Sequence, residues 1–110
     1  MENFELANLV AELSKAHSPY LEFIRKPSLS VGLYMLAAGA VDLQAPHTED
    51  EIYYVVSGRG LFQVESEHQA VGAGAVLFVA ANVEHRFHSI SEDMTILVVF
   101  APAEYTNASR

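Results

Sequence analysis

The sequence predicts an all-β domain with one short N-terminal helix. From residue 20 onward, short segments rich in β-branched, aromatic and aliphatic residues recur between turn-forming residues, at a spacing of about 8 to 12 positions that is typical of sandwiches and barrels. Only the first residues show the three-to-four-residue period of a helix. The chain has 110 residues, of which 51% are hydrophobic, enough for one core. We therefore expect a single domain.

The predicted helix covers residues 4–16. Its apolar residues are spaced i, i+3, i+4 and i+7 and lie on one face: Leu6, Leu9, Val10 and Leu13. Ser18 and Pro19 end it, because a residue before proline avoids the helical region. We expect residues 1–19 to pack as a helical segment on a barrel formed by residues 20–110.

The predicted strands follow one another to the end of the chain. They cover residues 29–39, 51–58, 60–67, 75–81, 85–91 and 94–102. Gly58, Arg59 and Gly60 are interpreted as a tight hairpin turn between two of these strands. The last seven residues, EYTNASR, are expected to fray.

Alternation along these strands predicts an apolar barrel interior. The expected interior residues are Phe62, Val64, Leu77, Val79, Phe87, Leu97 and Val99. An apolar pocket that contains one polar cluster is the usual form of a small-molecule site. A compact organic ligand is therefore a better fit than a large polymer.

Charge and composition exclude several functions. Six basic residues against fourteen acidic ones give a net charge of −8, which disfavours binding to nucleic acid or to an anionic membrane. The absence of cysteine excludes disulfides, thiolate metal sites and a cysteine nucleophile. The N-terminus lacks the basic region of a signal peptide, and no apolar run reaches the roughly 18 to 20 residues of a membrane span. We expect a cytoplasmic protein.

Three polar residues alternate just before an apolar strand. His47, Glu49 and Glu51 would share one face with Tyr53 if this strand is regular. Burying an imidazole and two carboxylates is costly unless something compensates, and a divalent cation would do so because it binds these groups. His85, which also begins an alternating strand after a turn, is the natural third ligand.

The spacing of these residues resembles the two motifs of the cupins. The first motif runs through Gly39, five residues, Ala45-Pro46-His47, three residues, Glu51, six residues and Gly58. The second runs through Gly74, five residues, Ala80-Ala81-Asn82, two residues, His85, three residues and Ser89. The resemblance covers roughly residues 30–101. It implies a double-stranded β-helix, or jelly-roll, barrel, with the N-terminal helix outside the motifs.

The resemblance implies that His47, Glu51 and His85 are metal ligands. Ala45 stands where the motif usually has a further histidine, so water or Glu49 would complete the set; for Glu49 itself, a solvated side chain is favoured over a ligand. Two histidines and one carboxylate suit iron(II) with open positions, or zinc as a Lewis acid. The sequence does not choose among iron, manganese, nickel and zinc.

The second motif departs from the usual pattern at three positions. The usual proline, glycine and asparagine of the second motif are replaced by the residues Ala80, Asn82 and Ser89. Asparagine tolerates the left-handed backbone that glycine provides. His88 is expected on the opposite face from His85. Tyr53 is a candidate pocket residue, although packing with a satisfied hydroxyl is the commoner role of a buried tyrosine.

Three functions remain open from the sequence. The first is a metal-dependent enzyme acting on a small organic molecule, oxygenase-like or isomerase-like, in which Glu51 is a ligand rather than a base. The second is a small-ligand-binding or sensing barrel without turnover, and the third is a metal-free structural barrel. Because cupins often pair through their sheets, the resemblance also implies a homodimer.

Overall fold

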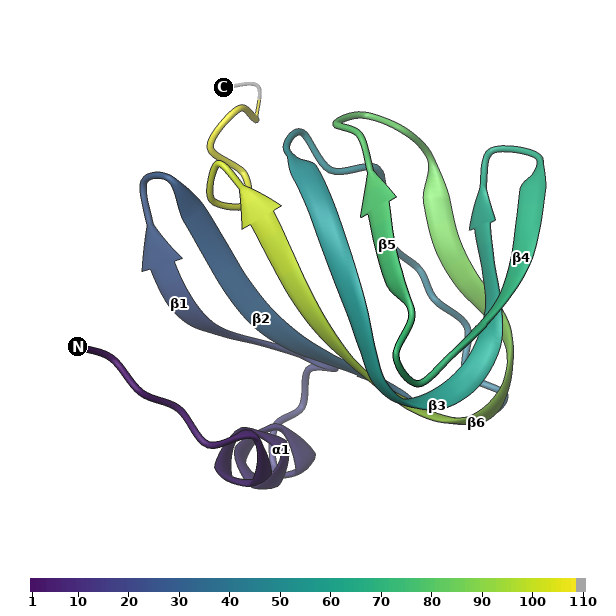
Figure 1. Cartoon of the computed structure of the whole chain (residues 1–110), viewed down its shortest axis with the longest axis horizontal. Coiled ribbons are helices and arrows are strands. Elements are labelled where there is room, and N and C mark those ends of the chain that lie inside the picture. The colour runs from purple at the N-terminus through teal and green to yellow at the C-terminus, as the bar shows by residue number, and fades with distance from the viewer. Residues whose placement is uncertain (109–110) are drawn as a thin grey trace.

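The computed structural model describes residues 1–108, and its fold is all-β with one helix, as predicted. Figure 1 shows the helix α1 at Leu6–Ser14 and six strands. The strands are β1 (Tyr20–Lys26), β2 (Leu29–Leu36), β3 (Asp50–Val64), β4 (Glu67–Gly72), β5 (Val76–Val79) and β6 (His85–Ala101). The described helix is too short and polar to span a membrane.

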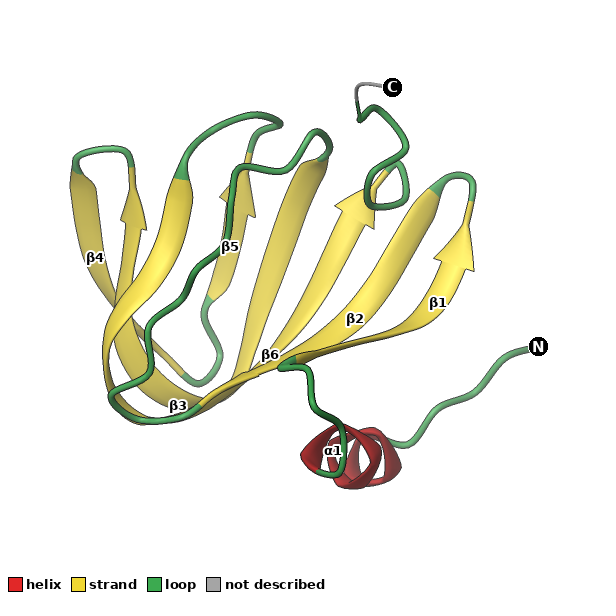
Figure 2. Cartoon of the chain, turned by 180° about the vertical axis from the view of Figure 1, so that it is seen from behind, coloured by secondary structure: helices red, strands yellow, loops and turns green. Residues whose placement is uncertain are grey.

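The strands form one strongly curled antiparallel sheet. Their order is β1-β2-β6-β3-β4, and β5 pairs with β3. The two long strands β3 and β6 bend so that both halves of the molecule are built on them (Figures 1 and 2). Within residues 1–108, no strand pairing joins β1 to β4, so the sheet curls as a jelly-roll without closing into the expected barrel.

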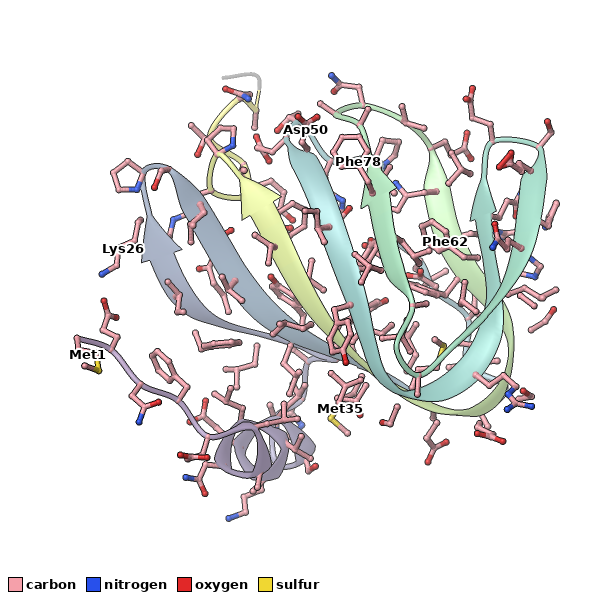
Figure 3. The ribbon with its side chains drawn as sticks, in the orientation of Figure 1. Met1, Lys26, Met35, Asp50, Phe62 and Phe78 are labelled. Atoms are coloured by element: carbon pink, nitrogen blue, oxygen red, sulfur yellow. The ribbon has the colours of Figure 1, made fainter. Side chains whose placement is uncertain are left out.

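The main core fills the concave side of this sheet. Phe62, for example, lies between the two arms of the curl (Figure 3). The fully or nearly fully buried members of the core include Tyr53, Val55, Phe62, Val79, Phe87, Met94, Ile96, Val98 and Phe100. Val64 and Leu77, also predicted for the interior, are partly buried and pack against this cluster.

Two of the predicted interior residues, Leu97 and Val99, lie on the opposite face. The buried positions of β6 are odd-numbered at His85 and Phe87 and even-numbered from Ile90 onward. Ser89 has a φ of 50° between these stretches. This residue interrupts the regular alternation, so side chains beyond it change faces. The prediction took the two halves of β6 as separate strands and therefore missed the change.

The predicted hairpin at residues 58–60 is also wrong. β3 continues through these residues, and the turn lies at Glu65 and Ser66, between the paired Val64 and Glu67. The pairing of β3 with β6 shifts register between Val55 and Leu61. The glycines therefore allow a long strand to bend, which is a second common use of glycine within a strand.

The helix packs on the convex side of the sheet. Leu9 and Leu13 form a second small core with Leu33 of β2, and Met35 packs against it (Figure 3). Two predicted members of the apolar face, Leu9 and Leu13, are buried, whereas Leu6 is exposed. Burial of this stripe stabilises a helix that is too short to be stable alone.

The end of the chain does not fray as expected. After β6, residues 103–107 form a compact turn in which Ala103 and Glu104 are buried. The prediction of a frayed end is wrong for residues 104–107, and its last two residues, 109 and 110, lie outside the described part of the chain.

Candidate metal centre

Backbone hydrogen bonds join the two predicted motifs. His47 lies in the loop before β3, Glu51 lies in β3, and His85 begins β6. The Asn82 N–H donates to the carbonyl oxygen of His47 over 2.6 Å. Asn82 has a φ of 65°, which confirms that it takes the left-handed backbone of the usual glycine. The curl of the sheet then places both imidazoles beside Glu51.

The three predicted ligands form one cluster. His47, Glu51 and His85 each present a ligand atom, and these atoms all lie within 4.8 Å of one another. Glu51 Oε1 lies 2.9 Å from His85 Nε2 and 3.4 Å from His47 Nδ1. The side chains of Glu51 and His85 are 1% exposed and that of His47 is 11% exposed. The cluster is therefore almost sealed from bulk water.

The hydrogen bonding of the cluster fits a cation. His85 Nδ1 lies 2.8 Å from the carbonyl oxygen of Val83, which can only accept, so Nδ1 carries the hydrogen and Nε2 is left for the site. Among residues 1–108, both Glu51 oxygens and His47 Nδ1 are buried without an aligned hydrogen-bond partner, although Glu51 Oε1 lies close to both imidazoles. Buried polar atoms rarely stay unpaired, and a divalent metal would satisfy all three.

The electrostatics point the same way. Burial lowers the pKa of His47, but the carboxylates of Glu104 and Glu51 outweigh burial and raise it to about 9. Burial also lowers the pKa of His85, and Glu51 again produces a net rise. Burial raises the pKa of Glu51, whereas His47 and His85 lower it overall. The carboxylates thus favour positive charge at this site. A metal ion would bind by displacing protons from the imidazoles.

Tyr53 is part of the buried network around the cluster. Its hydroxyl lies 3.0 Å from His85 Nε2 and donates to Gln44 Oε1 over 3.0 Å. Gln44 in turn is held by Asp42, which also accepts from the Tyr34 hydroxyl and the Phe87 N–H. Burial raises the pKa of Tyr53 well above its usual value, so its hydroxyl stays protonated.

Glu49 occupies a different environment from the other three. Its side chain is 1% exposed, so the expectation of a solvated acid is wrong. Glu49 accepts hydrogen bonds from the Thr48 hydroxyl and from the backbone N–H groups of Tyr105 and Asn107. Its carboxylate is thus engaged with the C-terminal turn, and Glu49 is not a member of the three-residue cluster.

Four neighbours of the cluster were missed from the sequence. Asp42 and Gln44 come from the loop between β2 and β3, which crosses the molecule in Figure 2. Glu104 and Tyr105 come from the C-terminal turn, and Glu104 Oε2 lies 3.2 Å from His47 Nε2. No motif or alternation marks these residues, because loops bring them to the site. The burial of an acidic residue in an irregular segment cannot be predicted from local sequence and is recognised only in the folded structure.

His88 lies away from the cluster. Its Nε2 is 2.9 Å from Nδ1 of His68 in β4, and its ring packs edge-on against that second imidazole. Burial and the neighbouring His68 lower the pKa of His88. His88 therefore belongs to a separate pair of imidazoles.

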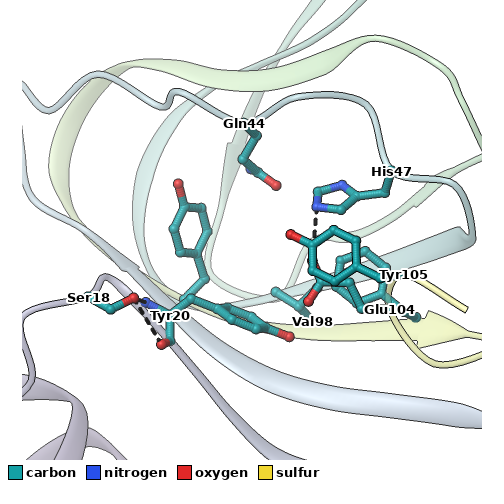
Figure 4. A pocket seen from close by; sticks show the side chains of 9 residues that line it. Ser18, Tyr20, Gln44, His47, Val98, Glu104 and Tyr105 are labelled. Carbon is teal, nitrogen blue, oxygen red and sulfur yellow. Dashed lines mark hydrogen bonds and ion pairs between the residues drawn. The ribbon is translucent and has the colours of Figure 1, made fainter. Parts of the chain in front are cut away.

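A pocket of about 340 Å³ opens beside the cluster (Figure 4). Its walls are largely aromatic, and none of the lining residues is a lysine or an arginine. They are Ser18, Tyr20, Tyr34, Gln44, His47, Val98, Phe100, Glu104 and Tyr105. The buried Tyr20 hydroxyl has no hydrogen-bond partner in the described part of the chain. A Cβ on Gly32 would lie 2.0 Å from that hydroxyl oxygen, so the glycine makes room for the Tyr20 ring.

Known proteins resemble this chain in sequence or in fold. The chain is 49% identical over 104 residues to the uncharacterized protein SCO3923 of Streptomyces coelicolor, covering 94% of this chain and 99% of that one. The structure of KdgF from a Halomonas species superposes with a TM-score of 0.71 at 22% identity, covering 80% of this chain and 84% of that one. Salicylate 1,2-dioxygenase from Pseudoaminobacter salicylatoxidans superposes with a TM-score of 0.78 at 12% identity, covering 89% of this chain and 33% of that one.

These two structural similarities establish the fold alone. The family follows from the sequence, since the family profile described as "Cupin domain" matches residues 32–100, well over half of the chain. That range contains both motifs and all three residues of the buried cluster. The chain is therefore a member of the cupin family.

Proposed function

We propose that this cupin binds a divalent metal through His47, Glu51 and His85 and uses it to transform a small organic molecule. The observation that carries the proposal is the convergence of buried, unpaired ligand atoms beside a pocket. A bound iron, manganese, nickel or zinc ion would supply Lewis-acid chemistry or, for a redox-active metal, dioxygen chemistry of the oxygenase type. Glu51 serves as a ligand rather than a base, because its Oε1 lies within 3.4 Å of a ring nitrogen of both imidazoles.

The chain's own residues bind and orient the substrate. The pocket volume of about 340 Å³ lies at the lower end for small-molecule sites and fits a compact molecule. The aromatic walls exclude water, and the unpaired Tyr20 hydroxyl offers a hydrogen bond to a polar group of the substrate. The Tyr53 hydroxyl donates to Gln44, and the Tyr53 ring packs beside the His85 ring with the ring centroids 5.9 Å apart. These features support either an oxygenase-like or an isomerase-like reaction.

Metal analysis and turnover assays test the proposal on the purified protein. We expect the wild-type protein to retain close to one divalent ion per chain. With iron(II), oxygen uptake on a panel of small ketones, phenols and thiols is expected to identify an oxygenase. Proton NMR of the same mixtures without oxygen is expected to detect an isomerisation. A protein that retains no metal would refute the proposal. A protein that binds metal and a panel member without turnover would instead be a binding or sensing barrel.

We also propose that two copies of the chain pair through an exposed outer apolar face. This face comprises Ile52 and Tyr54 of β3 and Val76 and Phe78 of β5, which are paired across the two strands. Phe78 is 64% exposed and Val76 is 68% exposed. The face continues over Leu97 and Val99 of β6, and contiguous apolar surface of this kind marks interaction sites.

The oligomeric state in solution tests this pairing. We expect light scattering to give a dimer for the wild-type protein and a monomer for Phe78→Asp, because the new charge would be buried at the interface. Val41→Asp places the same charge at an exposed apolar residue outside this face and is expected to leave the dimer intact. A wild-type monomer, or a dimer that survives Phe78→Asp, would contradict the pairing.

A further inference from the structure

The C-terminal turn, residues 103–107, forms one wall of the candidate metal centre. In Figure 4, Glu104 and Tyr105 lie against His47, and a dashed line joins His47 to Glu104. The Glu104 side chain is only 12% exposed, which is unusual for a carboxylate, and within residues 1–108 its one ion pair is with the His47 imidazole. A buried acid at the metal centre needs an explanation.

Hydrogen bonds to several other segments of the chain hold this turn in place. The buried Glu49 carboxylate accepts from the N–H of Tyr105 over 2.7 Å and from the N–H of Asn107 over 2.8 Å. The N–H of Glu104 donates to Ser30 Oγ over 2.9 Å, and Arg25 Nη2 donates to the Glu104 carbonyl oxygen over 2.8 Å. The backbone of Glu104 is thus fixed from both sides, which fixes where its side chain begins.

The two imidazoles of the cluster are then held in matching ways. His85 turns Nδ1 to the Val83 carbonyl and leaves Nε2 for the site. His47 turns Nε2 to Glu104 Oε2, at 3.2 Å, and leaves an unpaired Nδ1 facing Glu51. A metal-ligating histidine commonly donates its outer N–H to a carbonyl or carboxylate, which sets the tautomer and raises the basicity of the ligating nitrogen.

We propose that Glu104 is the positioning residue of His47, accepting its Nε2–H so that Nδ1 ligates the metal, and that Glu49 anchors the turn that carries Glu104. This inference rests on the metal centre proposed above. It gives a role to Glu49, which alternates with the ligands in sequence but points to the turn rather than to the cluster. It also makes the end of the chain part of the site.

Zinc binding provides a test that does not depend on turnover. Affinity is measured by competition with a chromophoric chelator for the wild-type protein, Glu104→Ala, Glu104→Gln and Glu49→Gln. We expect Glu104→Ala to bind zinc about 10- to 100-fold more weakly, the range for loss of such a partner. Glu104→Gln retains an acceptor oxygen and is expected to recover part of this loss. Glu84→Gln removes an exposed charge next to His85 and is expected to bind like the wild-type protein.

Nitrogen NMR of zinc-loaded wild-type protein gives a readout that needs no variant. The ¹⁵N shifts distinguish a metal-bound nitrogen from a protonated one, and we expect bound Nδ1 and protonated Nε2 for His47. For Glu49→Gln, we expect faster amide hydrogen exchange at Tyr105 and Asn107 together with weaker zinc binding.

The outcomes separate this inference from the proposed function. Zinc held through His47 Nε2, or full affinity in Glu104→Ala, would overturn the role of Glu104 while the three-ligand site stands. Full affinity in Glu49→Gln with a loosened turn would overturn the anchoring role. A wild-type protein that binds no zinc would overturn both the inference and the proposed metal centre.

Discussion

His85→Ala is expected to abolish stable zinc retention, and His47→Ala to do the same. Each change removes one of three protein ligands and leaves the Glu51 carboxylate with a single imidazole. Loss of a ligand should exceed the roughly 10- to 100-fold effect of losing an outer partner. Metal content after dialysis measures retention directly. Because a ligand present at about 100 times its Kd stabilises the folded state by about 2.7 kcal/mol, zinc should also raise the unfolding free energy of the wild-type protein.

His88→Ala is the matched control for these variants. His88 lies three residues from His85 on the same strand but pairs with His68 instead of Glu51. We expect His88→Ala to retain zinc and to show the full zinc-dependent gain in unfolding free energy. Equal retention of zinc by His85→Ala and His88→Ala would show that the cluster does not hold the metal.

Gly58→Ala is expected to cause a large loss of stability for the addition of a single methyl group. Gly58 has a φ of 91°, and a Cβ there would lie 2.2 Å from the backbone oxygen of Asp93 in β6. The left-handed backbone costs about 1 to 2 kcal/mol for a residue with a Cβ. Forcing apart two packed strands adds about 1 to 3 kcal/mol. Urea unfolding followed by tyrosine fluorescence measures the sum, since the chain has no tryptophan.

Gly74→Ala separates the two contributions. Gly74 has nearly the same φ, 93°, but a Cβ there would meet nothing within 4 Å. We expect Gly74→Ala to lower the free energy of unfolding only by the cost of the left-handed backbone, about 1 to 2 kcal/mol. Equal losses for the two variants would mean that contact with β6 contributes nothing at Gly58, and that the bend of β3 does not depend on this close approach.

Much of the fold was predictable because alternation is a local property. The strands at residues 29–39 and 75–81 were located from their composition, with ends a few residues too long. The long strands β3 and β6 were each divided in two, at Gly58 and near Ser91. In both cases the chain bends and changes register without leaving the sheet. Local sequence cannot distinguish a bend within a strand from a turn between strands, because both favour the same residue types.

The candidate site was predictable only where it follows a motif. The spacing of the two motifs identified His47, Glu51 and His85, and the structure brings these three together. Their function as ligands remains a prediction. Glu49 alternates with His47 and Glu51 in the sequence, but its side chain does not reach the cluster. His47 and Glu49 precede β3, which begins at Asp50. Outside a strand, alternate residues need not face the same way.

Hydrophobic period and motif spacing were enough to predict a β-rich cupin with an N-terminal helix, because both are properties of residues that are close together in the sequence. The face that Leu97 and Val99 occupy and the open edge of the sheet became known only from the folded structure. The same holds for the contact between Glu104 of the C-terminal turn and His47. These features depend on where a strand bends and on how loops from distant parts of the chain meet. No local pattern encodes such meetings, since packing and hydrogen bonding settle them only when the whole chain has folded.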